Sequence, residues 1–366
     1  MVVGTIIRCR DKYVPNGGLM TKNQDFEKLD LLVPETREIF QRRYDLLKHI
    51  EVYGPIGRRN LSLKSNQSER QVRNDGDFFK ERNLISYQME GMVITPEGVE
   101  ILEVLEGISE YYNGYMEWKK IIIENLGIKD IVIVDAHREN FKDTLKRMGI
   151  QGAKLLTKMT REGDIIGLTG GTSIYHLVEN FRQQTVLEPP VTLVPARGGL
   201  GATTKYQANT LAENLAQKMT GKYVPLYTPD SMSDEAMKYL KEDPAIKKAI
   251  DTIGEINLLV FGIGKADVMA RRRNLSNLVY NEIMASGAVS EAFGYYFNRK
   301  GEIVHEIPTI GITLEKVKSL KRLIAIAGGE EKAQAIVSVT NINKNLVLVT
   351  DHQCVREIIR ILGRKL

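Results

Sequence analysis

The chain has 366 residues, with 51 Lys and Arg residues against 46 Asp and Glu residues, so its formal net charge is only +5. Its 43% hydrophobic and 27% charged residues are typical of a globular protein, and no apolar run reaches the roughly 18–20 residues that cross a membrane. Two cysteines exclude a disulfide framework, and five scattered histidines exclude a structural zinc. We therefore expect a cytoplasmic protein of two domains and a linker, with no metal site, no cofactor and no membrane partner.

The first residues carry no hydrophobic periodicity. Residues 1–19 end in NGG, and Met20 is a candidate natural start that would make them an extension. Their charges follow the apolar residues and no cleavage pattern is present, which excludes an ordinary signal peptide. We expect residues 1–24 to form a flexible leader without a function.

Three helices and a hairpin are predicted over residues 25–95. The first helix begins near Arg37, and its apolar face carries Phe40, Tyr44, Leu47 and Ile50. The Pro and Gly residues of YGPIG end it, and a short second helix is expected around Arg58–Leu63. Ser68 is the candidate N-cap of the third helix, and LISYQMEGMVITPEG predicts two strands that turn around Glu90 and Gly91. This order is that of a winged helix-turn-helix.

The third helix has the chemistry of a DNA reader. Val72, Gly76 and Phe79 face inward, so the residues that face outward are Glu69, Arg70, Arg73, Asn74 and Asp77. Arg70 and Arg73 suit guanine edges or phosphates and Asn74 suits adenine, while Arg58 and Arg59 suit backbone phosphates. The predicted DNA-binding residues are Arg58, Arg59, Ser68, Glu69, Arg70, Arg73 and Asn74.

Local charge supports this interpretation. From Arg37 to Arg73 there are nine Lys and Arg residues and four Asp and Glu residues, an excess equal to that of the whole chain. A solvated charged face, or a three-helix module that binds another protein, remains the alternative.

Residues 96–125 are expected to continue as one long helical segment, with Ile101, Leu105, Ile108 and Tyr112 on one face. It is either a linker helix that pairs with its twin in a dimer or the first helix of the next domain's core. Helix-turn-helix proteins usually bind paired half-sites as dimers, so a homo-oligomer is expected.

From Lys129 onward, short apolar runs alternate with amphipathic helices. The predicted strands are DIVIVDA, DIIGLTG, VTLVPA, YVPLYTP, INLLVFGIG, RLIAIAGG and NLVLVTD. This alternation predicts an α/β fold over residues 126–366, with a doubly wound, mostly parallel sheet covered on both faces.

Four strand-to-helix turns of this sheet carry glycines or basic residues. They are Thr169–Ser173, Pro195–Gly201 with Arg197, GIGKADVMARRRN with Arg271, Arg272 and Arg273, and AGGEEKAQAI with Lys332. Ligands of open parallel sheets bind at such turns, and glycine amides with cations suit a multiply charged anion. Tight turns and, for the arginine triplet, a solvated or interface patch are the alternatives.

Two polar residues complete the candidate pocket. Glu291, in EAFGYYFN, would accept hydrogen bonds from sugar hydroxyls or act as a base, and Gln207 either joins it or is simply exposed. The sequence has no GxxxxGK[ST], no GxGxxG with a ribose-binding acid and no convincing nucleophile with a base. A pocket that binds without reacting is the simpler interpretation, and an isomerase or deaminase with Glu291 as base is the alternative. A constitutive DNA-binding scaffold with a vestigial pocket is a third.

The motifs PIGRRNLS, TGGTS, VTLVPARGGLG, QANT, ARRRN and EAFGYYFN together resemble the SorC/DeoR-type family of sugar-responsive transcriptional repressors. The resemblance runs from about residue 25 to the C-terminus and is specific to a branch that represses glycolytic genes. It implies a winged-helix domain joined to an effector domain similar to glucosamine-6-phosphate deaminase and ribose-5-phosphate isomerase. It also implies a dimer or tetramer that binds operator DNA and is relieved by fructose-1,6-bisphosphate.

The resemblance also implies an effector site. Its residues would be Gly170, Gly171, Thr172, Ser173, Arg197, Gly198, Gly199, Gln207, Arg272, Glu291 and Lys332. Ser173 stands where a second threonine is usual and keeps the hydroxyl. Arg271 stands where glutamine is usual, which leaves open which arginine of the triplet contacts phosphate.

Overall fold

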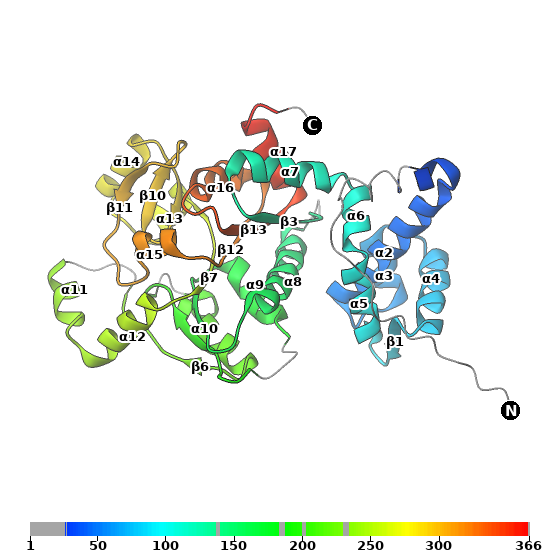
Figure 1. Ribbon diagram of the computed structural model, residues 1–366, viewed down its shortest axis with the longest axis horizontal. Helices are drawn as coiled ribbons and strands as arrows, with labels where there is room; N and C mark the ends of the chain where they lie inside the picture. Colours follow the sequence, from blue (N-terminus) through cyan, green and yellow to red (C-terminus); the bar gives the residue numbers. More distant parts are fainter. Residues whose placement is uncertain are drawn as a thin grey trace, which may run out of the picture. The chain divides into compact units, whose positions relative to one another are not determined.

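A computed structural model describes residues 26, 28–136, 140–182, 187–199, 203–229 and 234–364. The predicted leader 1–24, with Cys9 and Met20, lies outside these residues. The chain divides into two compact units, Met1–Gly114 and Tyr115–Leu366, so the division falls inside the segment 96–125 that was expected to link them (Figure 1). No described helix is long and apolar enough to cross a membrane.

The N-terminal unit contains the predicted three helices and hairpin. They are α2 (Glu35–Tyr53), α3 (Arg58–Ser65), α4 (Glu69–Glu81), β1 (Ile85–Gln88) and β2 (Gly91–Ile94). The strands pair antiparallel, and the helices enclose a core that includes Leu47, Ile50, Leu61, Val72 and Phe79. The winged helix-turn-helix is therefore confirmed.

The hairpin turn is displaced from the predicted one by one residue. Gln88 pairs with Gly91, so Met89 and Glu90 form the turn and Gly91 already opens β2. Gly91 has φ +137°, and a Cβ there would lie 2.3 Å from the backbone carbon of Ile56. Only glycine allows the wing to pass so close to the chain before α3.

The segment 96–125 is three helices, so the expectation of one long helix was wrong. They are α5 (Pro96–Val104), α6 (Glu106–Tyr112) and α7 (Tyr115–Leu126). Gly114 has φ +72°, a left-handed conformation that ends a helix. Leu102 of α5 packs in the core of the N-terminal unit, whereas Ile122 of α7 packs in the core of the C-terminal unit. The end of the segment is thus the first helix of the second core.

The C-terminal unit is built on a seven-stranded parallel sheet, as predicted. In sheet order its strands are β3 (Asp130–Val134), β13 (Leu346–Asp351), β12 (Leu323–Ile326), β7 (Leu258–Phe261), β4 (Ile165–Leu168), β5 (Thr192–Pro195) and β6 (Lys222–Tyr223). Six of the seven predicted apolar runs each contain one strand, whereas YVPLYTP overlaps β6 only at Tyr223.

Helices cover both faces of this sheet. One apolar cluster joins it to α8 (Phe141–Met159), α9 (Thr172–Asn180) and α10 (Ala208–Lys218). The other joins it to α7, α12 (Pro244–Gly254), α15 (Leu314–Ser319), α16 (Ala333–Thr340) and α17 (His352–Ile361). The fold class predicted for this unit, a doubly wound α/β sheet, is confirmed.

The order of the strands reverses in the middle of the sheet. β4 and β7 are neighbours, yet β4 continues towards β5 and β6 while β7 continues towards β12 and β13. Loops that leave the carboxyl ends of β4 and β7 therefore diverge to opposite sides. Such a switch point opens a crevice, which is where α/β proteins bind ligands.

A second, antiparallel sheet was not predicted. It comprises β8 (Gly264–Lys265), β9 (Ala288–Ala292), β10 (Tyr295–Asn298) and β11 (Ile303–Glu306), beside α13 (Ala266–Arg272) and α14 (Asn277–Ala285). The motif EAFGYYFN forms its β9–β10 hairpin, which turns at Phe293 and Gly294 with φ of 59° and 92°. This hairpin places Glu291 beside the carboxyl ends of the parallel strands. The remaining described elements are short: η1 (Thr204–Tyr206), α11 (Asp234–Leu240) and η2 (Glu330–Lys332).

Candidate functional site

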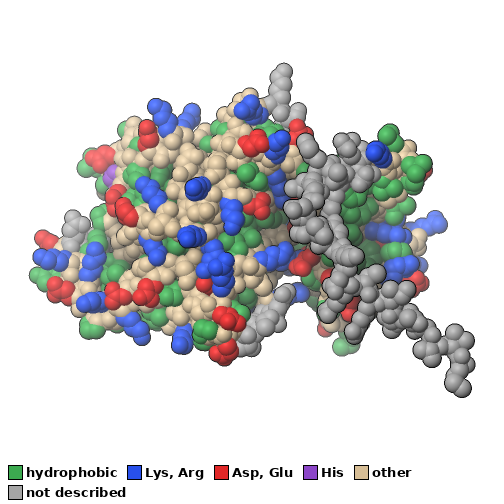
Figure 2. Space-filling view, in the orientation of Figure 1, with side chains coloured by type: hydrophobic (Ala, Val, Ile, Leu, Met, Phe, Trp, Pro, Cys, Tyr) green, Lys and Arg blue, Asp and Glu red, His purple; other side chains and the backbone are tan. Residues whose placement is uncertain are grey.

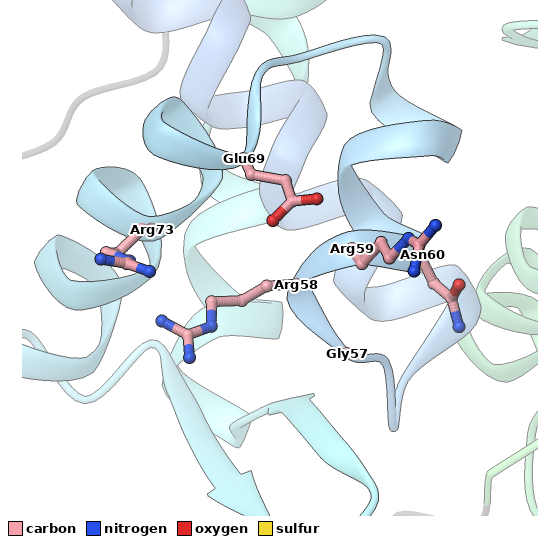
Figure 3. A pocket seen from close by; sticks show the side chains of 6 residues that line it. All are labelled: Gly57, Arg58, Arg59, Asn60, Glu69 and Arg73. Carbon is pink, nitrogen blue, oxygen red and sulfur yellow. The ribbon is translucent and has the colours of Figure 1, made fainter.

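An open concavity lies between the start of α3 and the first turns of α4. Its lining residues are Gly57, Arg58, Arg59, Asn60, Glu69 and Arg73. Figure 3 shows Arg58 and Arg59 extending from α3 and Arg73 from α4, with Glu69 between the two helices. Three of the predicted DNA-contacting arginines therefore come together on one surface.

The basic residues of this unit separate into bound and available groups. Arg42 and Arg43 of α2 lie 2.9 and 3.0 Å from the buried carboxylate of Asp75 on α4, so their charges hold the two helices together. Arg58, Arg59, Arg70 and Arg73 are exposed and form no ion pair among the residues that the structure describes. Figure 2 shows Lys and Arg side chains on the outer surface of this unit. The available positive charge is concentrated on α3 and α4.

The outward face of α4 is the predicted one. Glu69, Arg70, Arg73, Asn74 and Asp77 are all exposed, whereas Val72, Gly76 and Phe79 are buried. Ser68 caps the helix, because its Oγ accepts from the amide of Gln71 at 3.3 Å and donates to Gln71 Oε1 at 2.8 Å. Such a cap contributes about 1 kcal/mol to helix stability, so Ser68 has a structural role whether or not it also contacts DNA.

A cavity of about 520 Å³ lies at the switch point of the parallel sheet. It is formed by the turns that follow β4, β5, β7 and β12, together with Glu291 on β9. Its lining residues are Thr169, Gly170, Gly171, Thr172, Ser173, Ile174, Arg197, Gly198, Thr203, Tyr206, Gln207, Ala208, Gly262, Ile263, Gly264, Lys265, Val268, Met269, Arg272, Glu291, Ala292, Phe293, Glu331 and Lys332. Both its volume and its position suit a small polar ligand.

Every predicted effector residue except Gly199 lines this cavity. The amide of Gly199 donates instead to the carbonyl of Thr228 at 2.9 Å. A Cβ at Gly199 would lie 3.3 Å from Gln207 Oε1. Gly199 therefore shapes the second turn and leaves room for Gln207, which does line the cavity.

The first turn leads directly into the N-terminus of α9. Gly171 has φ +124°, and a Cβ on Gly170 would lie 2.6 Å from the carbonyl oxygen of Tyr206, so both positions favour glycine. Thr172 and Ser173 then offer hydroxyls in the first turn of the helix, where backbone amides have no partner within the helix. A helix start with these groups favours an anion.

Glu291 is the buried centre of an ion-pair cluster. Its Oε1 accepts from Arg197 Nη1 and Arg273 Nη2, each at 2.8 Å, and from the amide of Gly294 at 2.7 Å. Burial alone would raise the pKa of Glu291, but Arg273, Arg197 and the Gly294 amide lower that pKa to about 2. The carboxylate is therefore ionised at physiological pH and is a poor proton acceptor. Among the described residues no hydrogen bond is made to Oε2, which leaves that oxygen for a ligand.

The three consecutive arginines have three different environments. Arg271 is exposed and donates to the hydroxyl of Tyr280 at 3.2 Å, outside the cavity. Arg272 lines the cavity. Arg273 is buried and donates to Glu291 and, at 3.0 Å, to the hydroxyl of Tyr296. Of the three, Arg272 is therefore the one that lines the cavity.

Two lysines and Arg272 bring positive charge to the same cavity. Lys265 follows β7, and Lys332 follows β12. Burial lowers the pKa of Lys332 and so do Arg272 and Lys265, while Glu331 raises it. Lys265, Tyr206 and Phe293 also line the cavity and were not predicted. Lys265 stands in the GIGK turn and Phe293 in the EAFGYYFN motif, whereas Tyr206 carries no motif signal.

Comparison with known proteins agrees with both units. The family model "CggR N-terminal DNA binding domain" matches residues 39–108, and the model "Putative sugar-binding domain" matches residues 110–360. The Central glycolytic genes regulator of Bacillus subtilis (strain 168) is 36% identical over 338 residues, which cover 92% of this chain and 99% of that protein.

Two solved structures resemble the chain. One, from Enterococcus faecalis and assigned to the SorC family of transcriptional regulators, is 32% identical with a TM-score of 0.62. It covers 66% of this chain and 99% of its own. The full-length sorbitol operon regulator SorC from Klebsiella pneumoniae is 19% identical with a TM-score of 0.61, and covers 86% of this chain and 98% of its own. At that identity the second likeness supports the fold alone.

Proposed function

The chain belongs to the central glycolytic genes regulator family, within the SorC-type transcriptional regulators, and from this premise we propose that it represses glycolytic genes until a sugar phosphate binds. The proposed effector is fructose-1,6-bisphosphate in the cavity of the C-terminal unit. The observation that carries this proposal is that the N-terminus of α9, Arg272 and Lys332 line one cavity.

The roles at the DNA follow from exposure and charge. Arg58 and Arg59 at the start of α3 would bind backbone phosphates, which fix the register without reading the sequence. Arg70, Arg73 and Asn74 would reach base edges from the outward face of α4. Ser68 and Glu69 would lie at the same protein–DNA surface.

The roles at the effector follow from the cavity. Thr172 and Ser173 at the start of α9 suit one phosphate, and Arg272 with Lys332 suits the other. Glu291 Oε2 and Gln207 suit the hydroxyls of the sugar, and Gly170, Gly171 and Gly198 let the ligand approach the backbone. Arg197 would act both on the ligand and on Glu291, which it already binds.

Induction requires that the effector bind more tightly to the arrangement of the chain that does not bind DNA. A ligand with equal affinity for both arrangements would leave their populations unchanged. A hundredfold loss of operator affinity corresponds to a coupling of about 2.7 kcal/mol, within the usual range of allosteric proteins. A dimer or tetramer in the cytoplasm would provide the paired DNA-binding units on which such coupling acts.

The enzyme alternative is less well supported. An isomerase or deaminase would need Glu291 as its base, yet a carboxyl with a pKa of about 2 and two arginine partners has little tendency to take up a proton. The relatives are named as regulators, and their DNA-binding family model matches this chain. Turnover of a hexose phosphate by the full chain would favour the enzyme.

The proposal is tested by fluorescence anisotropy of the full chain on labelled DNA from upstream of its own operon, at one fixed salt concentration. We expect millimolar fructose-1,6-bisphosphate to weaken the complex and fructose-6-phosphate to leave it intact. A tight complex that neither sugar changes would contradict the proposed effector and favour a constitutive scaffold.

A further inference from the structure

We propose that Lys265 is a further effector-binding residue and that it determines the preference of the cavity for a ligand with a second phosphate. The inference rests on the proposed function, because it assumes that the cavity binds a sugar phosphate. It deepens that function by assigning a ligand contact to a residue outside the predicted site.

The backbone of Lys265 is fixed at the mouth of the switch-point crevice. Lys265 ends β8, where it pairs with Ser290, and its neighbour Gly264 pairs with Glu291. Ser290 and Glu291 are both buried, so this pairing anchors the turn after β7 to the interior of the unit. Lys265 lines the cavity together with Gly262, Ile263 and Gly264 of that turn.

The present partner of Lys265 is a weak one. Its Nζ lies 3.9 Å from Asp267 Oδ1, and the two side chains are 36% and 39% exposed. Exposed ion pairs of this kind contribute only about 0–1 kcal/mol. A phosphate oxygen in the cavity would therefore replace Asp267 at little cost and would gain a charge-assisted hydrogen bond.

The charges that line the cavity indicate what Lys265 adds. Of the cations that line the cavity, Arg197 is paired with Glu291, which leaves Lys265, Arg272 and Lys332, opposed by Glu331. With Lys265 this group carries a net charge of about +2, which matches a phosphate dianion, and without it about +1. Burial, and after it the charges of Arg272 and Lys265, lower the pKa of Lys332, so the cations of this group lie close enough to repel one another.

The test compares Lys265→Gln with the matched control Arg271→Gln. Arg271 lies on α13 between the cavity residues Met269 and Arg272 and carries the same charge, but it is exposed and does not line the cavity. Titration calorimetry of the full chain would measure the affinity of each variant for fructose-1,6-bisphosphate, fructose-1-phosphate and fructose-6-phosphate. Lys265→Arg would serve as the conservative variant.

We expect Lys265→Gln to lower the affinity for fructose-1,6-bisphosphate about tenfold, equivalent to about 1.4 kcal/mol. The affinity for one of the two monophosphates should change by less than about twofold. Arg271→Gln should change the affinity for each of the three sugar phosphates by less than about twofold. Lys265→Arg should keep most of the affinity for the bisphosphate. Unchanged bisphosphate affinity in Lys265→Gln, or an equal loss for all three sugars in both Gln variants, would overturn the inference. If the unaltered chain bound none of these sugars, the proposed function itself would be contradicted first.

Discussion

Arg273 Nη2 lies 2.8 Å from Glu291 Oε1, and both side chains are buried. Arg273 does not line the effector cavity, whereas Glu291 does. The charge of Arg273 therefore acts on a ligand through Glu291, by keeping that carboxylate ionised and by occupying its Oε1. This ion pair joins the end of α13 to β9, the strand that brings Glu291 to the cavity.

Glu291→Gln should destabilise the chain strongly. The change leaves the buried guanidinium of Arg273 without a counter-charge, and breaking a buried pair in this way typically costs about 3–5 kcal/mol. Urea unfolding at pH 7 measures the effect. Glu331→Gln is the matched control, because Glu331 also lines the cavity but is exposed, and it should change stability by less than about 0.5 kcal/mol. Equal stability of the two variants would refute the role given to the pair.

The stabilisation by Glu291 should depend on pH with a definite sign. Its pKa falls from an ordinary 4.5 to about 2 in the folded chain. Stability from a carboxyl with a depressed pKa is fully present above 4.5 and is lost as the pH falls towards 2. The stability difference between the unaltered chain and Glu291→Gln should be constant from pH 6 to 8 and should shrink below pH 4.5. A difference that grew on acidification would contradict the assignment.

Arg272→Gln should lower the affinity for fructose-1,6-bisphosphate about tenfold and leave the unfolding free energy unchanged. Arg272 lines the cavity, is exposed and has no hydrogen bond or ion pair among the described residues. Calorimetry and urea unfolding measure the two quantities. Arg197→Ala is a less selective test, since Arg197 also holds Glu291. A loss of stability in Arg272→Gln as large as its loss of affinity would argue against a ligand contact.

Arg73→Ala should weaken operator binding while effector affinity stays the same. If Arg73 contacts a phosphate, the slope of log K against log salt should become shallower by about 0.9, whereas a base contact would cost about 1–3 kcal/mol at one position. Anisotropy at several salt concentrations gives both. Arg360→Ala removes the same charge from the exposed face of α17 in the other unit and should have no effect on DNA affinity.

Asp75→Asn should loosen α4 from α2 in the DNA-binding unit. It removes the buried charge that holds Arg42 and Arg43, at a cost of about 3 kcal/mol. Hydrogen exchange of the amides of α4 should become faster, and operator affinity should fall with it. Asp77→Asn, on the exposed face of the same helix, should leave the exchange rates unaltered.

The parallel sheet could be predicted from local sequence, and so could the four strand-to-helix turns that carry glycines or basic residues. Each strand is a short apolar run between amphipathic helices, and parallel strands bring all their carboxyl ends to one edge. That is why Gly170, Arg197 and Lys332, far apart in the chain, could be expected in one site. The winged helix-turn-helix was predictable for the same reason, from helix period, caps and turn residues.

What could not be predicted depends on short elements and on side-chain direction. The antiparallel sheet includes β8, which has only two residues, and it gives no periodic signal. Successive helical residues point about 100° apart, so Arg271, Arg272 and Arg273 face different surroundings that the letters RRR do not distinguish. The break at Gly114 was missed because the apolar spacing of residues 96–125 continues across it.

The most direct test of the coupling between the two units is reciprocal calorimetry. Fructose-1,6-bisphosphate would be titrated into the full chain alone and into its complex with operator DNA, at one salt concentration. Linkage requires the DNA to lower effector affinity by the same factor by which the effector lowers DNA affinity, and we expect that factor to be about a hundredfold. Equal effector affinity for the free and the DNA-bound chain would contradict the account of an effector-relieved repressor.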